Sequence, residues 1–113
     1  MEYLTLNNGV QMPLVGFSTL MLQGEVYINT VMTAIESSCR MIDTAETYGN
    51  EAAVGEAIQQ SSVNRRELFL VTEVNFKSYE NAEQAVTQSL NRLQTDYIDL
   101  LLLHWPFANY YAA

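Results

Sequence analysis

Apolar and polar residues follow two different spacings along the chain, and these spacings predict strands and helices in turn. Short apolar runs have the length of buried strands and predict four of them, at 14–17, 40–42, 68–71 and 98–103. Three stretches place their apolar residues on one helical face and predict helices at 25–37, 50–60 and 81–93. Val26, Val31 and Ile35 would face the core from the first helix. Strands that alternate with helices favour a parallel sheet joined by right-handed crossovers.

A β-hairpin is predicted ahead of the first of these strands. Residues 3–6 and 10–13 are extended in pattern and flank a short polar turn. Asn8 and Gly9 in that turn both tolerate positive φ, so the pair is a strong hairpin signal. The expected fold class is therefore α/β, with a hairpin followed by about four parallel strands and three helices.

Three of the predicted strands end in side chains that can take part in acid–base chemistry, namely Asp43, Glu73 and His104. The carboxyl ends of parallel strands lie on one rim of a sheet, so we expect these groups to share a rim, with Tyr48 above it. Asn50 follows Tyr48 closely and is a good residue for a helix N-cap. Asp43, Glu73 and His104 also include the oxygen and imidazole ligands that divalent metals accept, although we expect no metal site.

Composition limits the class of protein and its partners. The chain has 113 residues, 49% of them hydrophobic and 16% charged, which predicts one folded domain over residues 1–113. The net charge of −8 argues against a nucleic-acid or anionic-membrane partner, because both require a basic surface. The single cysteine, Cys39, cannot form an internal disulfide, and no apolar run approaches the ~18–20 residues of a membrane span. We therefore expect a soluble, cytoplasmic protein.

Three stretches of the sequence together resemble the aldo-keto reductase family. Residues 6–17 are similar to its opening hairpin and first strand, residues 40–55 to its first signature, and residues 92–106 to the segment that enters its fourth strand. Agreement of several motifs in order is far more specific than one isolated motif. The resemblance implies part of a TIM-type (β/α)8 barrel, up to the fourth strand, and NADP(H)-dependent reduction of aldehydes or ketones to alcohols.

The resemblance also implies a catalytic set. Tyr48 would be the general acid that protonates the carbonyl oxygen, His104 would orient the carbonyl, and Asp43 would pair with a lysine. Glu73 stands where the family has that lysine. A neighbouring anion raises the pKa of a tyrosine, whereas a cation lowers it, so Glu73 would work against Tyr48.

The resemblance implies further contacts around the tip of the first strand and the end of the fourth. The tip is Ser18-Thr19-Leu20, where the family usually has Gly-Thr and an aromatic residue. The implied contacts with the cofactor come from Ser18, Thr19 and Asp43. The implied contacts with a small carbonyl substrate come from Leu20, Tyr48, His104 and Trp105.

The end of the sequence leaves three outcomes open. Leu100–Leu103 is apolar at every position, so we expect burial on both faces and a strand on each side. Four parallel strands cannot close into a barrel, which leaves two unpaired edges. The chain is then a reductase with an altered site, a non-catalytic half-barrel that self-associates through its edges, or a truncated product without a function of its own. Residues 108–113 have no helical pattern.

Overall fold

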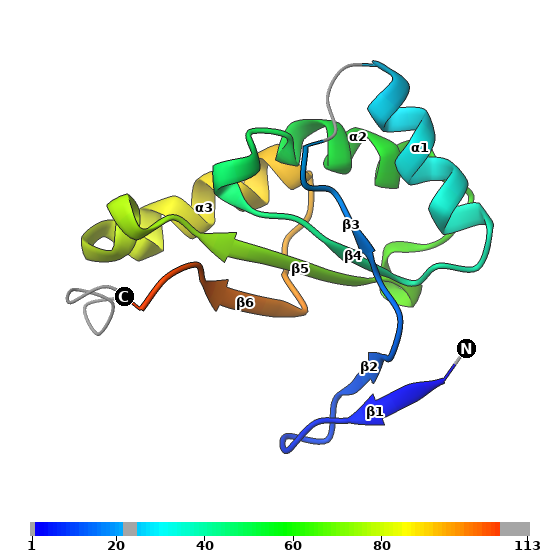
Figure 1. The fold of residues 1–113 in the computed structure, drawn as a ribbon, viewed down its shortest axis with the longest axis horizontal. Coiled ribbons are helices and arrows are strands. Elements are labelled where there is room, and N and C mark those ends of the chain that lie inside the picture. The colour runs from blue at the N-terminus through cyan, green and yellow to red at the C-terminus, as the bar shows by residue number, and fades with distance from the viewer. Residues whose placement is uncertain (1, 22–24, 107–113) are drawn as a thin grey trace.

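The computed structural model describes residues 2–21 and 25–106 and has the predicted α/β order (Figure 1). An antiparallel hairpin comes first, formed by β1 (Tyr3–Thr5) and β2 (Gln11–Pro13). A parallel sheet follows, in the order β3 (Phe17–Ser18), β4 (Met41–Asp43), β5 (Phe69–Val74) and β6 (Leu100–Leu103). The α-helices are α1 (Glu25–Glu36), α2 (Glu51–Gln60) and α3 (Ala82–Leu93). The 3-10 helices are η1 (Glu46–Tyr48), η2 (Arg65–Glu67) and η3 (Phe76–Asn81).

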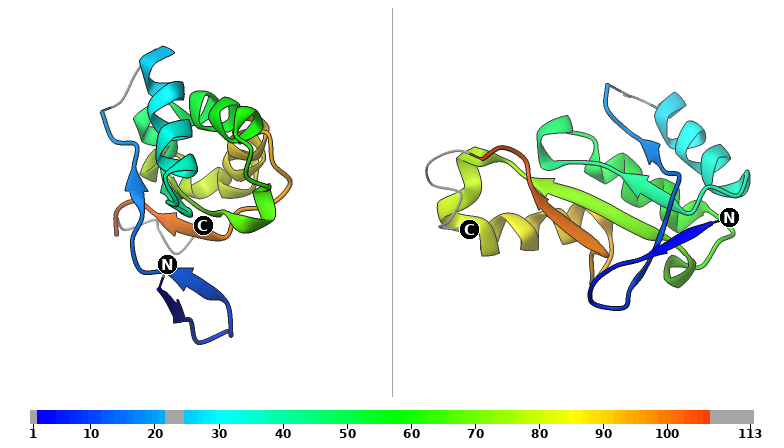
Figure 2. Two further views of the ribbon diagram at one scale, coloured as in Figure 1. Left: turned by 90° about the vertical axis from the view of Figure 1, so that its right-hand side faces the viewer. Right: turned by 60° about the horizontal axis from the view of Figure 1, so that its bottom comes forward.

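The three α-helices cover one face of the parallel sheet, and among the described residues the opposite face has no helix (Figures 1 and 2). The hairpin extends from the end of the sheet at which β3 begins. Ser18 pairs with Asp43, and Asp43 with Val71, so these side chains share one face. Glu73, two residues after Val71 in β5, is on the same face. The pleat thus directs Asp43 and Glu73 to the side away from the helices.

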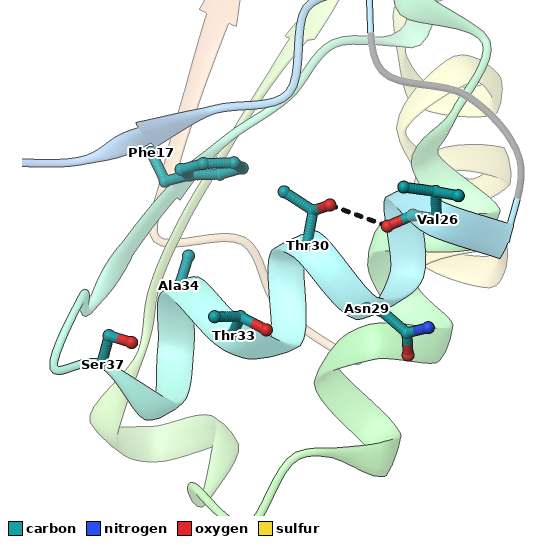
Figure 3. A pocket seen from close by; sticks show the side chains of 7 residues that line it. All are labelled: Phe17, Val26, Asn29, Thr30, Thr33, Ala34 and Ser37. Carbon is teal, nitrogen blue, oxygen red and sulfur yellow. Dashed lines mark hydrogen bonds between the residues drawn. The ribbon is translucent and has the colours of Figure 1, made fainter.

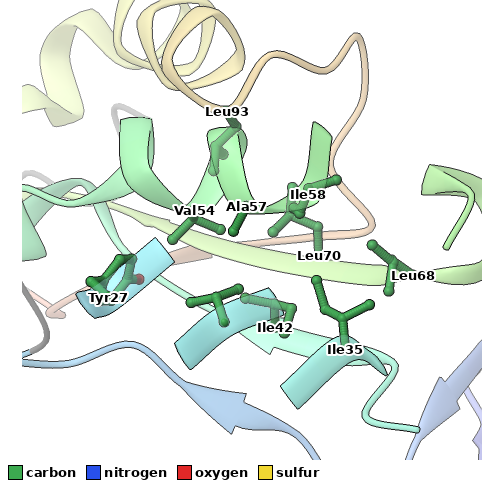
Figure 4. Close-up of a cluster of buried hydrophobic side chains, with 10 residues drawn as sticks. Tyr27, Ile35, Ile42, Val54, Ala57, Ile58, Leu68, Leu70 and Leu93 are labelled. Atoms are coloured by element: carbon green, nitrogen blue, oxygen red, sulfur yellow. The ribbon is translucent and has the colours of Figure 1, made fainter. Parts of the chain in front are cut away.

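The main core lies between the sheet and the helices (Figure 4). α1 contributes Tyr27, Val31 and Ile35, each at most 1% exposed. The cluster is completed from the sheet, α2, α3 and the residue before β5 by Ile42, Val54, Ala57, Ile58, Leu68, Leu70 and Leu93. Burying each large aliphatic side chain contributes about 1.5–3 kcal/mol, so this cluster is what fixes the helices on the sheet. Val26, by contrast, is 76% exposed, so the prediction that it faces the core is wrong. Its neighbour Tyr27 is buried there instead.

Two predictions about the strands also need correction. The run at 14–17 forms a strand only at Phe17–Ser18, and Leu14 and Val15 are 54% and 68% exposed. β6 is not buried on both faces, because Leu101, Leu102 and Leu103 are 37–42% exposed. Both differences have one cause: β3 and β6 are the two edges of the sheet, each with a single neighbouring strand. An apolar run predicts burial correctly only where strands lie on both sides.

The turn of the hairpin also differs in detail from its prediction. Gly9 has φ of +86°, but Asn8 does not have positive φ. The side chain of Asn8 instead accepts a hydrogen bond from the amide of Val10 at 3.1 Å. The turn therefore needs positive φ at one residue only, and the Asn8 side chain adds to two main-chain bonds, between Leu6 and Val10 and between Gly9 and Leu6. The predicted tail 108–113 lies outside the described residues.

Candidate active site

The site begins where β3 and β4 end side by side. The carbonyl oxygen of Asp43 accepts hydrogen bonds from the amide of Thr19 at 3.0 Å and from its hydroxyl at 3.2 Å. Thr19 is fully buried, whereas Ser18 and Leu20 on either side of it are exposed. These bonds fix Asp43 against the tip of β3. Of the predicted cofactor contacts, the Thr19 side chain is thus already used within the protein.

Tyr48 ends the short helix η1, and Asn50 ties this segment to the strand tips. Asn50 is at the N-cap position of α2, as predicted, but its side chain makes no capping bond there. Its amide donates to the carbonyl of Thr19 at 2.8 Å, and its oxygen accepts from the hydroxyl of Thr44 at 3.1 Å. Asn50 therefore connects the segment carrying Tyr48 to β3 and to the residue after Asp43.

The structure brings four of the predicted residues together at this rim. The rings of Tyr48 and His104 meet edge to face, with centroids 6.1 Å apart and an interplanar angle of 86°. The ring of Trp105 stacks on His104 at 5.8 Å. Nδ1 of His104 lies 3.3 Å from Oε2 of Glu73. Glu73 is inside β5, which runs on to Val74, and not at a strand tip as predicted.

Electrostatics couple Asp43 to this group. Burial raises the pKa of Asp43, and His104 opposes that rise. Burial also raises the pKa of Glu73, where His104 lowers it and Asp43 raises it. The pKa of Tyr48 is raised by burial and then by the charges of Glu73 and Asp43. Burial and, after it, the two carboxylates thus all favour the protonated form of Tyr48.

Buried polar atoms remain unsatisfied in the same place. Oδ1 of Asp43 and Nδ1 of His104 are inaccessible to solvent and have no hydrogen-bond partner, since the contact of His104 with Glu73 lacks hydrogen-bond geometry. An unsatisfied buried acceptor costs about 1–3 kcal/mol. A cationic donor beside Asp43 would remove this cost, and Glu73 provides a second anion instead.

Sequence reasoning missed a buried ion pair behind the site. Glu51, 2% exposed, accepts from Arg92 at 2.7 Å and from the hydroxyls of Thr72 at 2.7 Å and Ser89 at 3.1 Å. Glu51 is the first residue of α2, directly after Asn50. The only local indication of its burial was that Glu51 is a carboxylate within a stretch whose other residues match the core-facing pattern of α2. Its partners are far away along the chain, so the sequence did not reveal them.

The described residues contain neither a cluster of metal-ligating side chains nor a helix of membrane-spanning length. No group of three or more His, Cys, Asp and Glu side chains in residues 2–21 and 25–106 is arranged to hold a metal ion. Among the same residues, no helix has the length and apolar character needed to cross a bilayer.

The sequence profile described as "Aldo/keto reductase family" matches residues 15–112, most of the chain. The chain belongs to this family. It is 44% identical over 103 residues to an aldo-keto reductase of Mycobacterium avium, which covers 89% of the chain and 36% of that relative. It is 46% identical over 106 residues to morphine 6-dehydrogenase of Pseudomonas putida, covering 91% of the chain and 36% of the relative.

A solved member of the family has the same fold. The aldo/keto reductase of Brucella melitensis superposes with a TM-score of 0.89 at 37% identity, over 94% of this chain and 41% of that one. This agreement confirms the partial TIM barrel predicted from the sequence. The chain spans little more than a third of the length of the two curated relatives.

Aldo-keto reductases generally use NADP(H), and the described residues offer more partners of the kind its hydroxyl and amide groups need than of the kind its phosphates need. Asp43 and the exposed Ser18 offer oxygen atoms suited to hydroxyl and amide groups. The phosphates need cations, and here the basic residues lie elsewhere: Arg40, Arg65 and Arg66 precede the strands, at the opposite end of the sheet. Arg92 is paired with Glu51. Lys77 in η3 lies at the rim end and is exposed. Among the described residues, the rim end thus offers a phosphate one exposed basic side chain.

A separate groove of about 570 Å³ lies between β3 and the outer side of α1 (Figure 3). Phe17 forms one wall, and Thr30 and Ala34 of α1 form another. The hydroxyl of Thr30 donates to the carbonyl of Val26 at 2.7 Å and so is used within the helix. The groove contains none of the predicted catalytic side chains, but it runs along the free edge of the sheet at β3.

Proposed function

We propose that this chain provides the carbonyl-binding and proton-donating part of an NADP(H)-dependent aldo-keto reductase site. The observation that carries the proposal is the edge-to-face contact of Tyr48 and His104 at 6.1 Å, beside the carboxylates of Asp43 and Glu73. The substrate class is a small aldehyde or ketone. NADP(H), when bound, supplies the hydride.

The chain's own residues would act on the carbonyl oxygen. Tyr48 carries a phenolic proton that it would donate to this oxygen, and the neighbouring His104 would orient the carbonyl by hydrogen bonding. Trp105, stacked on His104 and 54% exposed, would form an apolar wall of the substrate site. Ser18, Thr19 and Asp43 remain the predicted cofactor contacts, and Leu20 remains a predicted substrate contact.

Glu73 makes this site a weak one. Its charge raises the pKa of Tyr48, so the phenol stays protonated but is a poorer acid. A misplaced acid–base partner typically costs about 10²–10⁴ in rate. We therefore expect that the altered lysine position limits turnover wherever the rest of the barrel is present.

A chimera tests this proposal. Residues 1–106 would replace the equivalent part of the Mycobacterium avium relative, and NADPH oxidation with an aldehyde would be followed with Glu73 and with Glu73→Lys. We expect the Glu73→Lys chimera to turn over faster by a factor of about 10²–10⁴.

Tyr48→Phe in the faster chimera is the control and should abolish turnover. An inactive Glu73→Lys chimera that folds would contradict the proposal. The 113-residue chain alone should bind NADPH too weakly to turn over in either form.

Self-association is a second candidate, favoured by a different observation. Leu101–Leu103 of β6 are 37–42% exposed at one edge of the sheet, and the groove beside Phe17 lies at the other. Exposed apolar edge strands pair readily with further strands. A half-barrel that associates with a second copy through these edges needs no catalysis. Sedimentation that shows one monomeric species at all concentrations would contradict this candidate.

A further inference from the structure

Tyr79 lies outside the predicted catalytic set, yet its hydroxyl bonds to the segment that carries that set. It belongs to η3 and is fully buried. The hydroxyl donates to the carbonyl oxygen of Trp105 at 2.6 Å and accepts from the amide of Trp105 at 2.7 Å. One side chain thus satisfies both main-chain polar groups of a residue that follows His104 directly.

These two bonds lie just beyond the last residue pair of the sheet. The ladder between β5 and β6 ends at the pair Val74–Leu103, and the amide of His104 still donates to the carbonyl of Val74 at 3.1 Å. Past this bond the chain bends at residues 104 and 105, and the Tyr79 hydroxyl bonds to it there. In Figure 1, η3, which follows the tip of the β5 arrow, lies at the same end of the sheet as the tip of the β6 arrow.

The residue before Tyr79 connects the same turn to the other half of the site. The hydroxyl of Ser78 donates to Oε1 of Glu46 at 3.0 Å. Glu46 begins η1, the single 3-10 turn that ends at Tyr48. η3 is therefore bonded on one side to the segment of Tyr48 and on the other to the segment of His104.

We propose that Tyr79 is a positioning residue that holds His104 and Trp105 in place, and that Ser78 holds Tyr48 opposite them. The two bonds of Tyr79 and the one of Ser78 together would set the 6.1 Å spacing between the Tyr48 and His104 rings. The importance of that spacing rests on the proposed reductase function. The positions themselves can be measured without turnover, so the two proposals can fail separately.

The hydroxyl can be tested apart from the ring. The ring of Tyr79 packs with Val74 and Ala85, and phenylalanine would fill the same space. Tyr79→Phe therefore removes only the two bonds to Trp105. Trp105 is the single tryptophan of the sequence, so its fluorescence reports on this point alone.

Amide hydrogen exchange by NMR and acrylamide quenching of Trp105 are the measurements. In Tyr79→Phe we expect the Trp105 amide to exchange about tenfold faster or more, with stronger quenching, while the amides of the main core keep their rates. Tyr27→Phe is the matched control, because Tyr27 is equally buried but lies in the other hydrophobic cluster. It should leave Trp105 unchanged. Ser78→Ala should accelerate the Tyr48 amide and not that of Trp105.

Three results would overturn the proposal. One is an unchanged Trp105 amide and unchanged quenching in Tyr79→Phe. Another is that exchange of all core amides becomes faster by the same factor in Tyr79→Phe, which would show that the hydroxyl stabilises the whole fold and does not position Trp105 in particular. The third needs no variant: in the unaltered chain, the Trp105 amide would exchange as fast as an unprotected amide. This last measurement keeps the test decisive if Tyr79→Phe does not fold.

Discussion

Glu73 shows how one residue can oppose a site that its neighbours otherwise preserve. It contacts His104 at 3.3 Å, and its charge adds to that of Asp43 in raising the pKa of Tyr48. Two carboxylates in one partly buried place disfavour each other's ionised form. Within residues 2–21 and 25–106, no lysine or arginine forms an ion pair with either carboxylate, and His104 is the group that lowers the pKa of both.

Removing the charge of Glu73 should change the titration of Tyr48. In Glu73→Gln we expect the pKa of Tyr48 to fall, and in Glu73→Lys to fall further, since an anion is first removed and then replaced by a cation. NMR of tyrosines labelled at Cζ measures this, with Tyr48→Phe to assign the signal. Glu67→Gln, an exposed site in η2, is the control and should have no effect. An unchanged Tyr48 titration in both Glu73 variants would show that the charges are not coupled.

The same substitution should alter the dependence of stability on pH. The pKa of Glu73 is higher in the folded chain than its ordinary value of 4.5, so the folded state holds the proton more tightly. The contribution of Glu73 to the free energy of unfolding therefore falls as pH rises from 4.5 through the pKa that Glu73 has in the folded chain. Glu73→Gln should be more stable than the unaltered chain at pH 7, and the difference should vanish below pH 4.5. Urea unfolding at both pH values measures it, and an equal difference at both would contradict the assignment.

At the scale of elements, α2 is the helix on which the site depends. Its first residue, Glu51, is bonded to β5 through Thr72 and to α3 through Arg92. Asn50, one residue earlier, bonds to the tip of β3. The position of Tyr48 thus follows from how α2 is fixed between its neighbours.

Breaking the buried ion pair should lower the free energy of unfolding more than removing an exposed charge does. Arg92→Ala would leave the Glu51 carboxylate buried without its cation. The cost should be about 3 kcal/mol, at the lower end for buried pairs because Arg92 is 38% exposed. Arg66→Ala, at an exposed position of η2, should change stability by about 0.5 kcal/mol or less. Urea unfolding compares the two, and equal costs would contradict the importance of the pair.

The contact between α2 and α3 leaves no room for a side chain at Gly55. A Cβ there would lie 2.5 Å from the carbonyl oxygen of Arg92 and 2.7 Å from the carbonyl carbon of Leu93, both main-chain atoms. Alanine gains about 1 kcal/mol over glycine inside a helix, but overpacking typically costs about 1–3 kcal/mol. Because main-chain atoms cannot move aside singly, we expect Gly55→Ala to destabilise the chain by about 1–2 kcal/mol.

Thermal or urea unfolding tests this expectation. Ala52→Gly, at an exposed position of the same helix, is the control and should lose about 1 kcal/mol through helix propensity alone. If Gly55→Ala instead gains stability, the close approach of the helices is not what selects glycine.

At the scale of the molecule, the four-stranded sheet has two edges and one face without helices in the described residues. β6 has one neighbour, and its leucines are partly exposed on both faces. An open parallel sheet with apolar edges is unusual, because parallel sheets normally have both faces covered. In the described residues, the apolar edge at β6 is thus the surface from which a prediction about association follows.

A charge at the edge should reduce association. We expect the chain to self-associate with rising concentration, and Leu101→Lys to shift it toward the monomer, since lysine on an edge strand opposes pairing. Leu4→Lys, at a 55% exposed position of the hairpin, is the control and should leave association unchanged. Sedimentation velocity measures both. Equal association of all three proteins would show that β6 is not the interface.

The sequence by itself determined the order of the elements. The helices at 25–36, 51–60 and 82–93 were predicted within about one residue, because their apolar spacing has the period of a helix. The approach of His104 and Glu73 followed from the same logic, since parallel strands end at one rim. The family, too, was recognisable from local motifs.

Only the tertiary structure decided what depends on contacts between distant residues. The side chain of Asn50 bonds to Thr19 and does not cap its own helix, and Glu51 of α2 pairs with Arg92 of α3. Tyr79 reaches the main chain of Trp105 from another turn. The exposure of Leu101 depends on a neighbouring strand, which no local run of leucines specifies. Local spacing sets which way a backbone segment folds, whereas hydrogen-bond partners and burial are properties of the assembled sheet and its helices.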